Sequence, residues 1–261
     1  MVDLEYCKKW RLRDKDTYQR VHINTADDFS LLTAKCSEII ISGLNQAYFE
    51  RFCACHADNF EIIHIQACPL IRDLSPFQNL RNVQWLEINW NQKAGAFWDM
   101  SGNISLCGLL LHDMNKISSM DGLEKAPALT GFSITESEDV KIYLDTLEPL
   151  ALCEKIEQLE IRIEGIRDES ALPVTKMKSL KEMGSSLSLF ETEQFAMLTA
   201  RLKNVKLQID RPYFVFPRSP EENASSRNVR VVGKKKPWLA EQSPKLKQYE
   251  NEWNALVAKY T

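Results

Sequence analysis

The 261 residues carry a formal net charge of −3 at pH 7, which does not suggest a nucleic acid or an acidic lipid surface as a partner. Hydrophobic residues make up 44% of the chain, enough for a sizeable core. No stretch approaches the ~20 apolar residues that span a bilayer, and the charged first residues contain no signal peptide, so we expect a cytoplasmic protein with no membrane partner.

Residues 1–16 are charged and fit no repeat, so we expect them to form an N-terminal cap or arm. From residue 17 onward a pattern of three hydrophobic residues recurs along the chain. The second residue lies three positions after the first, and the third lies two positions after the second. We call this pattern the frame. Its middle positions in the centre of the chain are Ile63, Leu86, Leu109 and Phe132, each 23 residues after the one before. A fixed period in the twenties with this frame is the signature of a leucine-rich repeat solenoid.

The frame continues on both sides of this centre with less regular steps. Its further middle positions are Val21, Ile39, Leu159 and Val205. Between the last two, either Met183 or Leu187 fits the middle position, and the sequence leaves both open. The chain thus contains about eight or nine coils, with the register between 165 and 200 undecided.

Each frame predicts a short strand whose apolar residues point inward, because successive side chains of a strand point to opposite faces. One coil cannot bury its apolar edge alone, so stacked coils share one core. Segments between the strands, such as 46–56 with its apolar stripe, predict helical turns. We therefore expect an α/β fold over residues 17–210, a horseshoe-shaped leucine-rich repeat solenoid with a parallel sheet on its concave side.

Residues 211–261 depart from the repeat, and we expect them to form a C-terminal cap. Tyr213–Phe216 alternates like an edge strand, and Val229–Val232 predicts another. Ser243 and Pro244 predict a helix start, with serine at the N-cap and proline at the first helical position. The apolar stripe of this helix consists of Leu246, Tyr249, Trp253, Leu256 and Tyr260. The open end of a solenoid exposes strand edges and core, which such a tail would cover.

One stretch carries the frame together with its turn residues. It reads Ile71-x-Asp73-Leu74-Ser75-Pro76-Phe77-x-x-Leu80-x-Asn82-Val83-x-x-Leu86-x-Ile88-x-x-Asn91. It resembles the short repeat of internalins and of protein-phosphatase regulatory solenoids, and residues 117–123 resemble it again. In that repeat class an asparagine or cysteine follows the strand and bonds the backbone of neighbouring coils, as Cys68 and Asn91 would. The equivalent positions that depart from the pattern are Met114, Ser137 and Glu164. The resemblance thus implies an incomplete polar ladder and an irregular horseshoe.

Few residues offer catalytic or metal chemistry. Cys53, Cys55 and His56 are soft ligands, but cysteines two positions apart on a helix direct their thiols to different faces. His112 and Asp113 are adjacent in sequence, which does not make them partners in space. No serine lies in a G-x-S-x-G motif, and no glycine-rich phosphate loop occurs. We therefore expect no metal, no cofactor and no enzyme activity.

Two further features have a simple structural interpretation. Seven cysteines are scattered along the chain, and without an export signal we expect all of them to be reduced thiols. The run Lys234–Lys236 lies beside Trp238, where a solvated loop is expected and a nucleic-acid contact is the alternative.

The strongest functional signal lies on the outward side of the predicted strands. Trp85, Trp90 and Leu110 are large apolar residues in expected solvent, ringed by charges, which is the profile of an interface anchor. An alternative for both Trp85 and Trp90 is that they pack within the fold, Trp90 on Phe97 or Trp98. The residues expected nearest the centre of a partner-binding surface are Trp85, Glu87, Trp90, His112, Asp113, Glu136 and Arg162.

The sequence as a whole favours a bacterial, cytoplasmic protein that is a monomer when unbound and binds another protein on its concave face. One version neutralises a toxin by covering its active site. A second version is a regulatory or adaptor subunit of an enzyme such as a phosphatase. A third alternative, from a different class of function, is a carbohydrate-active protein with a parallel β-helix fold. The helix predicted over residues 46–56 argues against this fold.

Overall fold

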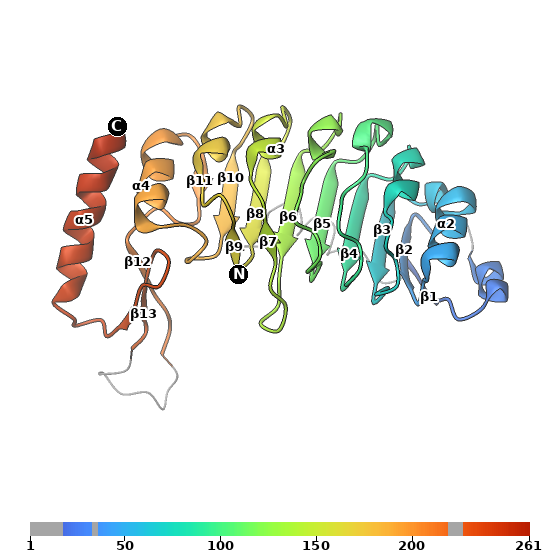
Figure 1. Ribbon diagram of the computed structural model, residues 1–261, viewed down its shortest axis with the longest axis horizontal. Helices are drawn as coiled ribbons and strands as arrows, with labels where there is room; N and C mark the ends of the chain where they lie inside the picture. Colours follow the sequence, from blue (N-terminus) through green and yellow to red (C-terminus); the bar gives the residue numbers. More distant parts are fainter. Residues whose placement is uncertain (1–17, 33–35, 219–226) are drawn as a thin grey trace.

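The computed structural model describes residues 18–32, 36–218 and 227–261. In this part of the chain, nine strands pair in parallel and form one long sheet, and Figure 1 shows them side by side along the molecule. These strands are β1 (Tyr18–His22), β2 (Glu38–Ser42), β3 (Ile62–Gln66), β4 (Trp85–Asn89), β5 (Gly108–His112), β6 (Gly131–Thr135), β8 (Gln158–Arg162), β10 (Glu182–Ser185) and β11 (Lys206–Leu207). A separate parallel ribbon joins β7 (Tyr143–Leu144) and β9 (Gly165–Ile166).

The pairing of the strands follows the 23-residue frame. Leu86, Leu109 and Phe132 pair with one another across β4, β5 and β6, so the middle positions form one row. This row continues to Met183 on β10, which settles the choice between Met183 and Leu187. The fold is a leucine-rich repeat solenoid.

At both ends of the sheet the predicted middle positions are wrong by two residues. Val21 pairs with Ile41, so it takes the third position of its frame and not the middle one. At the other end Leu207, and not Val205, pairs with Met183. A shift of two residues leaves the same side chains pointing inward, so the alternation of apolar and polar residues detects a slip of one residue and not of two.

Helical segments connect the strands and gather along one side of them in Figure 1. The α-helices are α2 (Gln46–Cys55), α3 (Glu148–Ala151) and α4 (Thr192–Arg201). The 3-10 helices are η2 (Ala26–Leu31), η3 (Ala57–Asn59), η4 (Ser75–Asn79), η5 (Met100–Gly102), η6 (Leu123–Lys125) and η7 (Leu172–Lys176). Pro76, Pro149 and Pro173 lie in the first turns of these helices. An N–H group at that position has no acceptor within the helix, so proline costs no hydrogen bond there. This helical layer excludes the parallel β-helix that the sequence left as an alternative.

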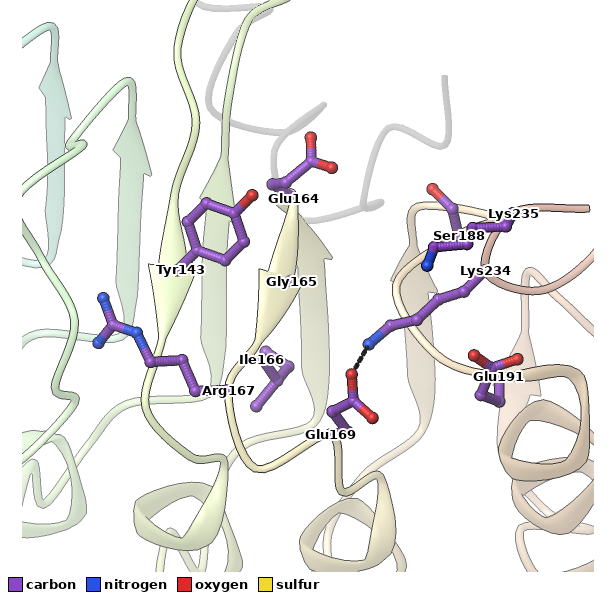
Figure 2. A pocket seen from close by; sticks show the side chains of 10 residues that line it. All are labelled: Tyr143, Glu164, Gly165, Ile166, Arg167, Glu169, Ser188, Glu191, Lys234 and Lys235. Atoms are coloured by element: carbon purple, nitrogen blue, oxygen red, sulfur yellow. Dashed lines mark hydrogen bonds and ion pairs between the residues drawn. The ribbon is translucent and has the colours of Figure 1, made fainter.

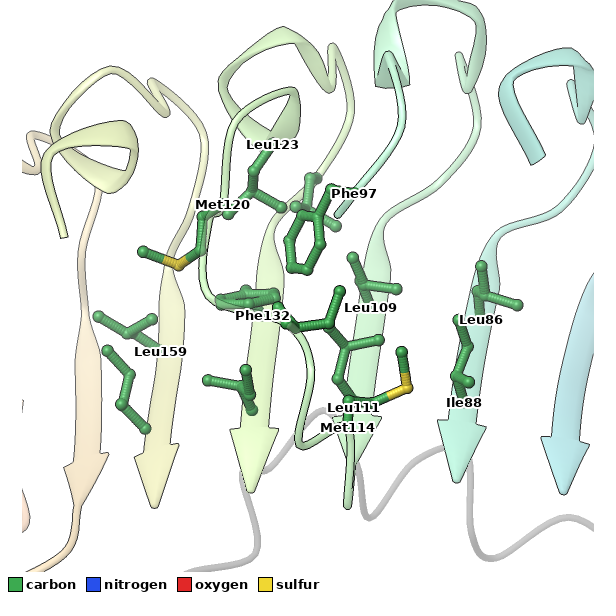
Figure 3. Close-up of a cluster of buried hydrophobic side chains, with 14 of the residues drawn as sticks. Leu86, Ile88, Phe97, Leu109, Leu111, Met114, Met120, Leu123, Phe132 and Leu159 are labelled. Atoms are coloured by element: carbon green, nitrogen blue, oxygen red, sulfur yellow. The ribbon is translucent and has the colours of Figure 1, made fainter. Parts of the chain in front are cut away.

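The core lies between the sheet and the helical layer. The inward strand residues Ile63, Leu86 and Leu109 are 0%, 1% and 0% exposed. Figure 3 shows strand residues and residues of the connecting segments filling one cluster. Its labelled members are Leu86, Ile88, Phe97, Leu109, Leu111, Met114, Met120, Leu123, Phe132 and Leu159. Each coil therefore covers the apolar edge of the next, as a stack of repeats requires.

A short polar ladder runs behind the strand ends. The Asn91 side chain is fully buried and donates to the carbonyls of Cys68 and Ile71 at 2.9 Å each. One coil earlier, the Cys68 thiol accepts from the N–H of Leu44 at 3.3 Å. One coil later, Met114 is fully buried and apolar, so the ladder stops. The incomplete ladder that the resemblance implied is thus present.

The chain ends in a small antiparallel sheet and a helix. The strands are β12 (Tyr213–Val215), β13 (Val229–Val231) and β14 (Trp238–Leu239), and the helix is α5 (Lys245–Tyr260). Helix α5 packs against α4, with Trp253 only 4% exposed and the Lys259 ammonium 2.6 Å from a Glu193 carboxylate oxygen. The domain limits at 16 and 210 stay a prediction, and residues 1–16 lie outside the described residues. In the described ranges, no helix has the length and hydropathy required to cross a bilayer.

Candidate binding surface on the concave face

We call the outward side of strands β2–β10, opposite the core, the concave face. Its central row consists of Ile40, His64, Glu87, Leu110, Ser133, Glu160 and Gly184, which pair across neighbouring strands. A second row contains Trp85, near the start of the strands, and a third contains His112, at their end. The predicted partner-binding residues lie in these rows or just beyond the strand ends.

Trp85 is buried, so its expected exposure is wrong. The residue is 3% exposed, and its ring lies over Gly108 on the next strand. A Cβ built on Gly108 would come within 1.9 Å of ring carbon Cε3 of Trp85. Gly131 pairs with Gly108 on the following strand, so the row that begins with Trp85 continues with two glycines. Trp85 thus packs the concave face and does not present a free ring.

We expect Gly108→Ala to lower the free energy of unfolding by roughly 1–3 kcal/mol, because the new methyl group occupies the position of the Trp85 ring. Urea denaturation measures the change. Gly95→Ala is the matched control, since the nearest atom to a Cβ at Gly95 is 3.6 Å away. Equal stability of the Gly108→Ala variant and the wild type would contradict the packing of Trp85 on Gly108.

The residue that follows each central strand adopts a left-handed backbone conformation. φ is +51° at Ala67, +60° at Trp90 and +56° at Asp113, at intervals of 23 residues. In this conformation each N–H donates to the carbonyl of the last residue of the next strand, with N···O distances of 3.0, 2.9 and 3.0 Å. The turn therefore extends the hydrogen-bond ladder by one residue, whatever side chain it carries.

Trp90 combines this backbone conformation with exposure to solvent. A bulky residue at positive φ is uncommon and strained. Trp90 is nevertheless 43% exposed. Phe97 and Trp98 are 9% and 3% exposed and pack on each other, with ring centroids 6.3 Å apart. Trp90 is therefore partly exposed to solvent at the end of β4, whereas the Phe97 and Trp98 rings belong to the core.

His112 and Asp113 are in contact, which corrects the expectation that they are unrelated neighbours. His112 Nε2 lies 3.3 Å from Asp113 Oδ2, and Nδ1 lies 2.8 Å from Thr135 Oγ1. Asp113 is 9% exposed, and its Oδ1 accepts from the N–H of Ser137 at 2.7 Å. The Asp113 carboxylate thus forms a hydrogen bond to the next coil at the point where Met114 interrupts the polar ladder. The His112 side chain is 37% exposed.

Glu136 and Arg162 are tied into local networks. Glu136 Oε2 accepts from the N–H of Ile142 at 2.6 Å, and the Glu136 side chain is 10% exposed. Arg162 Nε donates to Glu160 Oε1 at 2.5 Å, and its Nη2 donates to Gln208 Oε1 at 2.8 Å. Both side chains therefore bond within the fold, which leaves less of their polar surface for a partner.

The predicted Glu87 belongs to a cluster with Glu38 and His64, two residues that the site prediction did not include. His64 Nε2 lies 3.0 Å from Glu38 Oε1, and Nδ1 lies 2.8 Å from Glu87 Oε2. The three side chains are 9%, 14% and 20% exposed, in that order. We call them the Glu–His–Glu cluster. Burial lowers the pKa of His64, but the hydrogen bond and charge of Glu87, followed by those of Glu38, raise it more, so the net shift is upward.

A pocket of about 460 Å³ lies away from the concave strands, between the β7–β9 ribbon and residues 234–235. Figure 2 shows its lining, which consists of Tyr143, Glu164, Gly165, Ile166, Arg167, Glu169, Ser188, Glu191, Lys234 and Lys235. Lys234 pairs with Glu169 at 2.8 Å and Lys141 with Glu164 at 2.9 Å. These charges are matched within the chain, and Lys234 is therefore bound to the solenoid and is not a solvated loop residue.

The cysteine thiols are unpaired, and the residues that could bind a metal ion are not grouped within the described part of the chain. The six cysteines that the structure describes are free. Burial raises the pKa of Cys68 to about 11 and that of Cys153 to about 12, which makes these thiols poor nucleophiles. Within the described ranges, no three histidine, cysteine, aspartate or glutamate side chains are placed to hold a metal ion. Cys7 lies outside those ranges.

Comparison with known proteins finds similarity to solved structures. No protein-family model matches the chain, and no curated protein does. An internalin (inlF) of Listeria monocytogenes is similar, with 17% sequence identity and a TM-score of 0.34. The similarity covers 71% of this chain and 62% of the internalin, so this chain spans less than two thirds of that structure. The leucine-rich repeat fold itself is evident from the strand register.

Proposed function

We propose that the chain is a non-catalytic binding module that recognises another protein through the end of its concave face, around Trp90 and His112. Trp90 carries the proposal. The repeat uses Ala67 and Asp113 in the same left-handed turn, so the fold does not require an indole there. An exposed tryptophan in a strained turn is explained by a contact with a partner, and tryptophan is enriched among the residues that dominate binding energy.

The surroundings of Trp90 support a protein partner. Asn89 and His112 are half-buried polar residues on neighbouring strands, and they would form a polar rim beside the apolar anchor. The face is built on paired strands, so little ordering is required when a partner binds. Trp85, Asp113 and Glu136, which the sequence placed in the centre of the surface, would support it from within.

We further propose that the partner is an enzyme that the chain neutralises or regulates. A preformed face can cover an active site, as a toxin inhibitor would, or hold a catalytic subunit, as a phosphatase regulator would. A cytoplasmic location, a bacterial source and a monomeric unbound state complete this proposal.

The partner is first recovered from native lysate and purified. We expect Trp90→Ala to weaken its binding to the chain by more than tenfold, since anchors of this kind contribute ~2 kcal/mol or more to the binding free energy. Alanine is accommodated in the turn, as Ala67 demonstrates. Trp238→Ala is the matched control, because Trp238 on β14 is also 43% exposed. Loss of binding in the Trp238 variant and not in the Trp90 variant would move the interface to the C-terminal sheet.

A further inference from the structure

Positive charge is concentrated in one part of this acidic chain. Residues 211–247 contain nine lysines and arginines against three glutamates, a net charge of +6, whereas the whole chain carries −3. The rest of the chain therefore carries −9. A basic region on an otherwise acidic protein attracts acidic ligands, and this asymmetry is a sign of an interaction surface. The small C-terminal sheet is built from this basic region.

One face of the C-terminal sheet exposes two aromatic rings. Phe214, Arg230 and Trp238 pair across β12, β13 and β14, so their side chains lie on the same face. Phe216 is two residues after Phe214 and shares this face. Phe216 and Trp238 are 41% and 43% exposed, and their ring centroids are 5.3 Å apart. The two rings therefore form a continuous apolar pair that solvent and ligands can reach.

The opposite face of the sheet is closed. Val229 and Val231 are both 0% exposed, and Tyr213 donates to Glu250 of α5 at 2.6 Å. These residues alternate with those of the aromatic face along β12 and β13. The sheet thus packs against the rest of the chain on this side and leaves the aromatic pair outward.

Arginines accompany the exposed rings. The Arg230 guanidinium lies 5.8 Å from the centroid of the Trp238 ring. Arg227 is exposed and immediately precedes the residue whose carbonyl accepts from the N–H of Phe216 at 2.8 Å. We call Phe216, Arg227, Arg230 and Trp238 the aromatic–arginine surface. Tryptophan and arginine are the residue types most enriched among those that dominate binding energy at protein interfaces.

We propose that the aromatic–arginine surface binds an acidic segment of a second protein, and that an apolar side chain of this segment packs on Phe216 and Trp238. The planar guanidinium matches a carboxylate with two parallel hydrogen bonds. Arg218, two residues after Phe216, already pairs with the Glu241 carboxylate at 3.1 Å. An aspartate or glutamate of the ligand makes the same kind of contact with the exposed arginine of the surface.

A single-stranded nucleic acid suits this surface less well. Its bases bind by stacking on open aromatic faces. Phe216 and Trp238 are already in contact and their planes are tilted by 51°, so a base does not fit between them. An aliphatic or aromatic side chain of a peptide requires only the outer side of the pair.

The aromatic–arginine surface is separate from the site at Trp90. In the sheet, β4 and β11 are five strand spacings apart, roughly 24 Å at ~4.8 Å each. The concave face near Trp90 also carries the carboxylates of Glu87 and Asp113, which repel an acidic segment. The inference therefore goes beyond the proposed function, and Trp238→Ala remains a control for the partner that binds at Trp90.

The test uses the full chain and a fluorescein-labelled peptide with one phenylalanine between two runs of four aspartates. One comparison peptide has asparagines in place of the aspartates, and another has glycine in place of the phenylalanine. Fluorescence anisotropy should show the acidic phenylalanine peptide bound at least fivefold more tightly than either. Its affinity should fall as salt is added, because salt screens exposed charges.

Two variants of the chain assign this binding to the surface. Trp238→Ala should weaken the acidic peptide by about tenfold, because half of the aromatic pair is removed. Leu172→Ala is the matched control, since Leu172 on η7 is 42% exposed. Arg227→Gln should weaken the peptide at least threefold, and the exposed Arg81, before β4, provides the control Arg81→Gln.

Phe216→Ala is a second aromatic variant in case Trp238→Ala does not fold, which circular dichroism detects. Equal affinity of the acidic peptide for the wild type and a folded aromatic variant would overturn the proposal. Equal affinity for the asparagine peptide would overturn the choice of an acidic ligand. Tighter binding of an oligodeoxythymidylate of equal charge would assign the surface to nucleic acid instead. The peptide experiment uses no recovered partner, so its failure leaves the result at Trp90 unchanged.

Discussion

Leu109→Asp is expected to remove most of the stability of the fold. Leu109 is 0% exposed and pairs with Leu86 and Phe132 in the central row of the core. An unpaired carboxylate at this position loses its hydration and gains no partner, which costs several kcal/mol. Domains are stable by only ~5–15 kcal/mol, so the variant should be largely unfolded or melt far below the wild type. Circular dichroism with thermal melting measures the effect.

Leu110→Asp is the matched control for this experiment. Leu110 is the next residue on β5, points to the concave face and is half-buried. Its carboxylate would remain hydrated, so the change in melting temperature should be much smaller than for Leu109→Asp. Equal melting temperatures for the two variants would contradict the assignment of Leu109 to the core side of the sheet.

Asn91→Leu is expected to lower the free energy of unfolding by about 3 kcal/mol or more. Besides donating to two carbonyls, the Asn91 side chain accepts from the N–H groups of Lys93 and Ala94 at 3.0 and 2.8 Å. Leucine has a similar volume but satisfies none of these four groups, and each buried polar group left without a partner costs about 1–3 kcal/mol. Urea denaturation of the variant measures the loss.

The exposed Asn82 provides the comparison for this prediction. Its side chain makes one hydrogen bond, to the carbonyl of Asp58 at 3.1 Å, next to water. Asn82→Leu should therefore change the free energy of unfolding by no more than about 0.5 kcal/mol. If both variants were equally stable, the buried ladder at Asn91 would make no measurable contribution to the fold.

The sequence predicted the solenoid well because the fold depends on a local and repeated pattern. Each inward residue at positions 63, 86, 109 and 132 must be apolar, and the fixed spacing places these residues in one row. At the ends of the sheet the spacing between coils changes, and apolar alternation alone allows a shift of two residues. The errors at Val21 and Val205 therefore occurred where only alternation was available.

The concave face was less predictable, because exposure there depends on the neighbouring strands. Nothing next to Trp85 in sequence indicates that Gly108, 23 residues later, leaves room for its ring. The structural roles of Asp113 and Glu136 depend on backbone N–H groups of the following loop. A signal for the Glu–His–Glu cluster was present, since His64 and Glu87 are 23 residues apart and so had to be adjacent.

The most direct test of the proposed function is site-specific photo-crosslinking to the recovered partner. A photoreactive residue at Asn89 lies at the end of the concave face, and the same residue at Gln78 lies on the exposed surface of η4. The proposal predicts that the partner is crosslinked from position 89 and not from position 78, and that Trp90→Ala abolishes the crosslink. Crosslinking from position 78 with none from position 89 would contradict a concave-face interface.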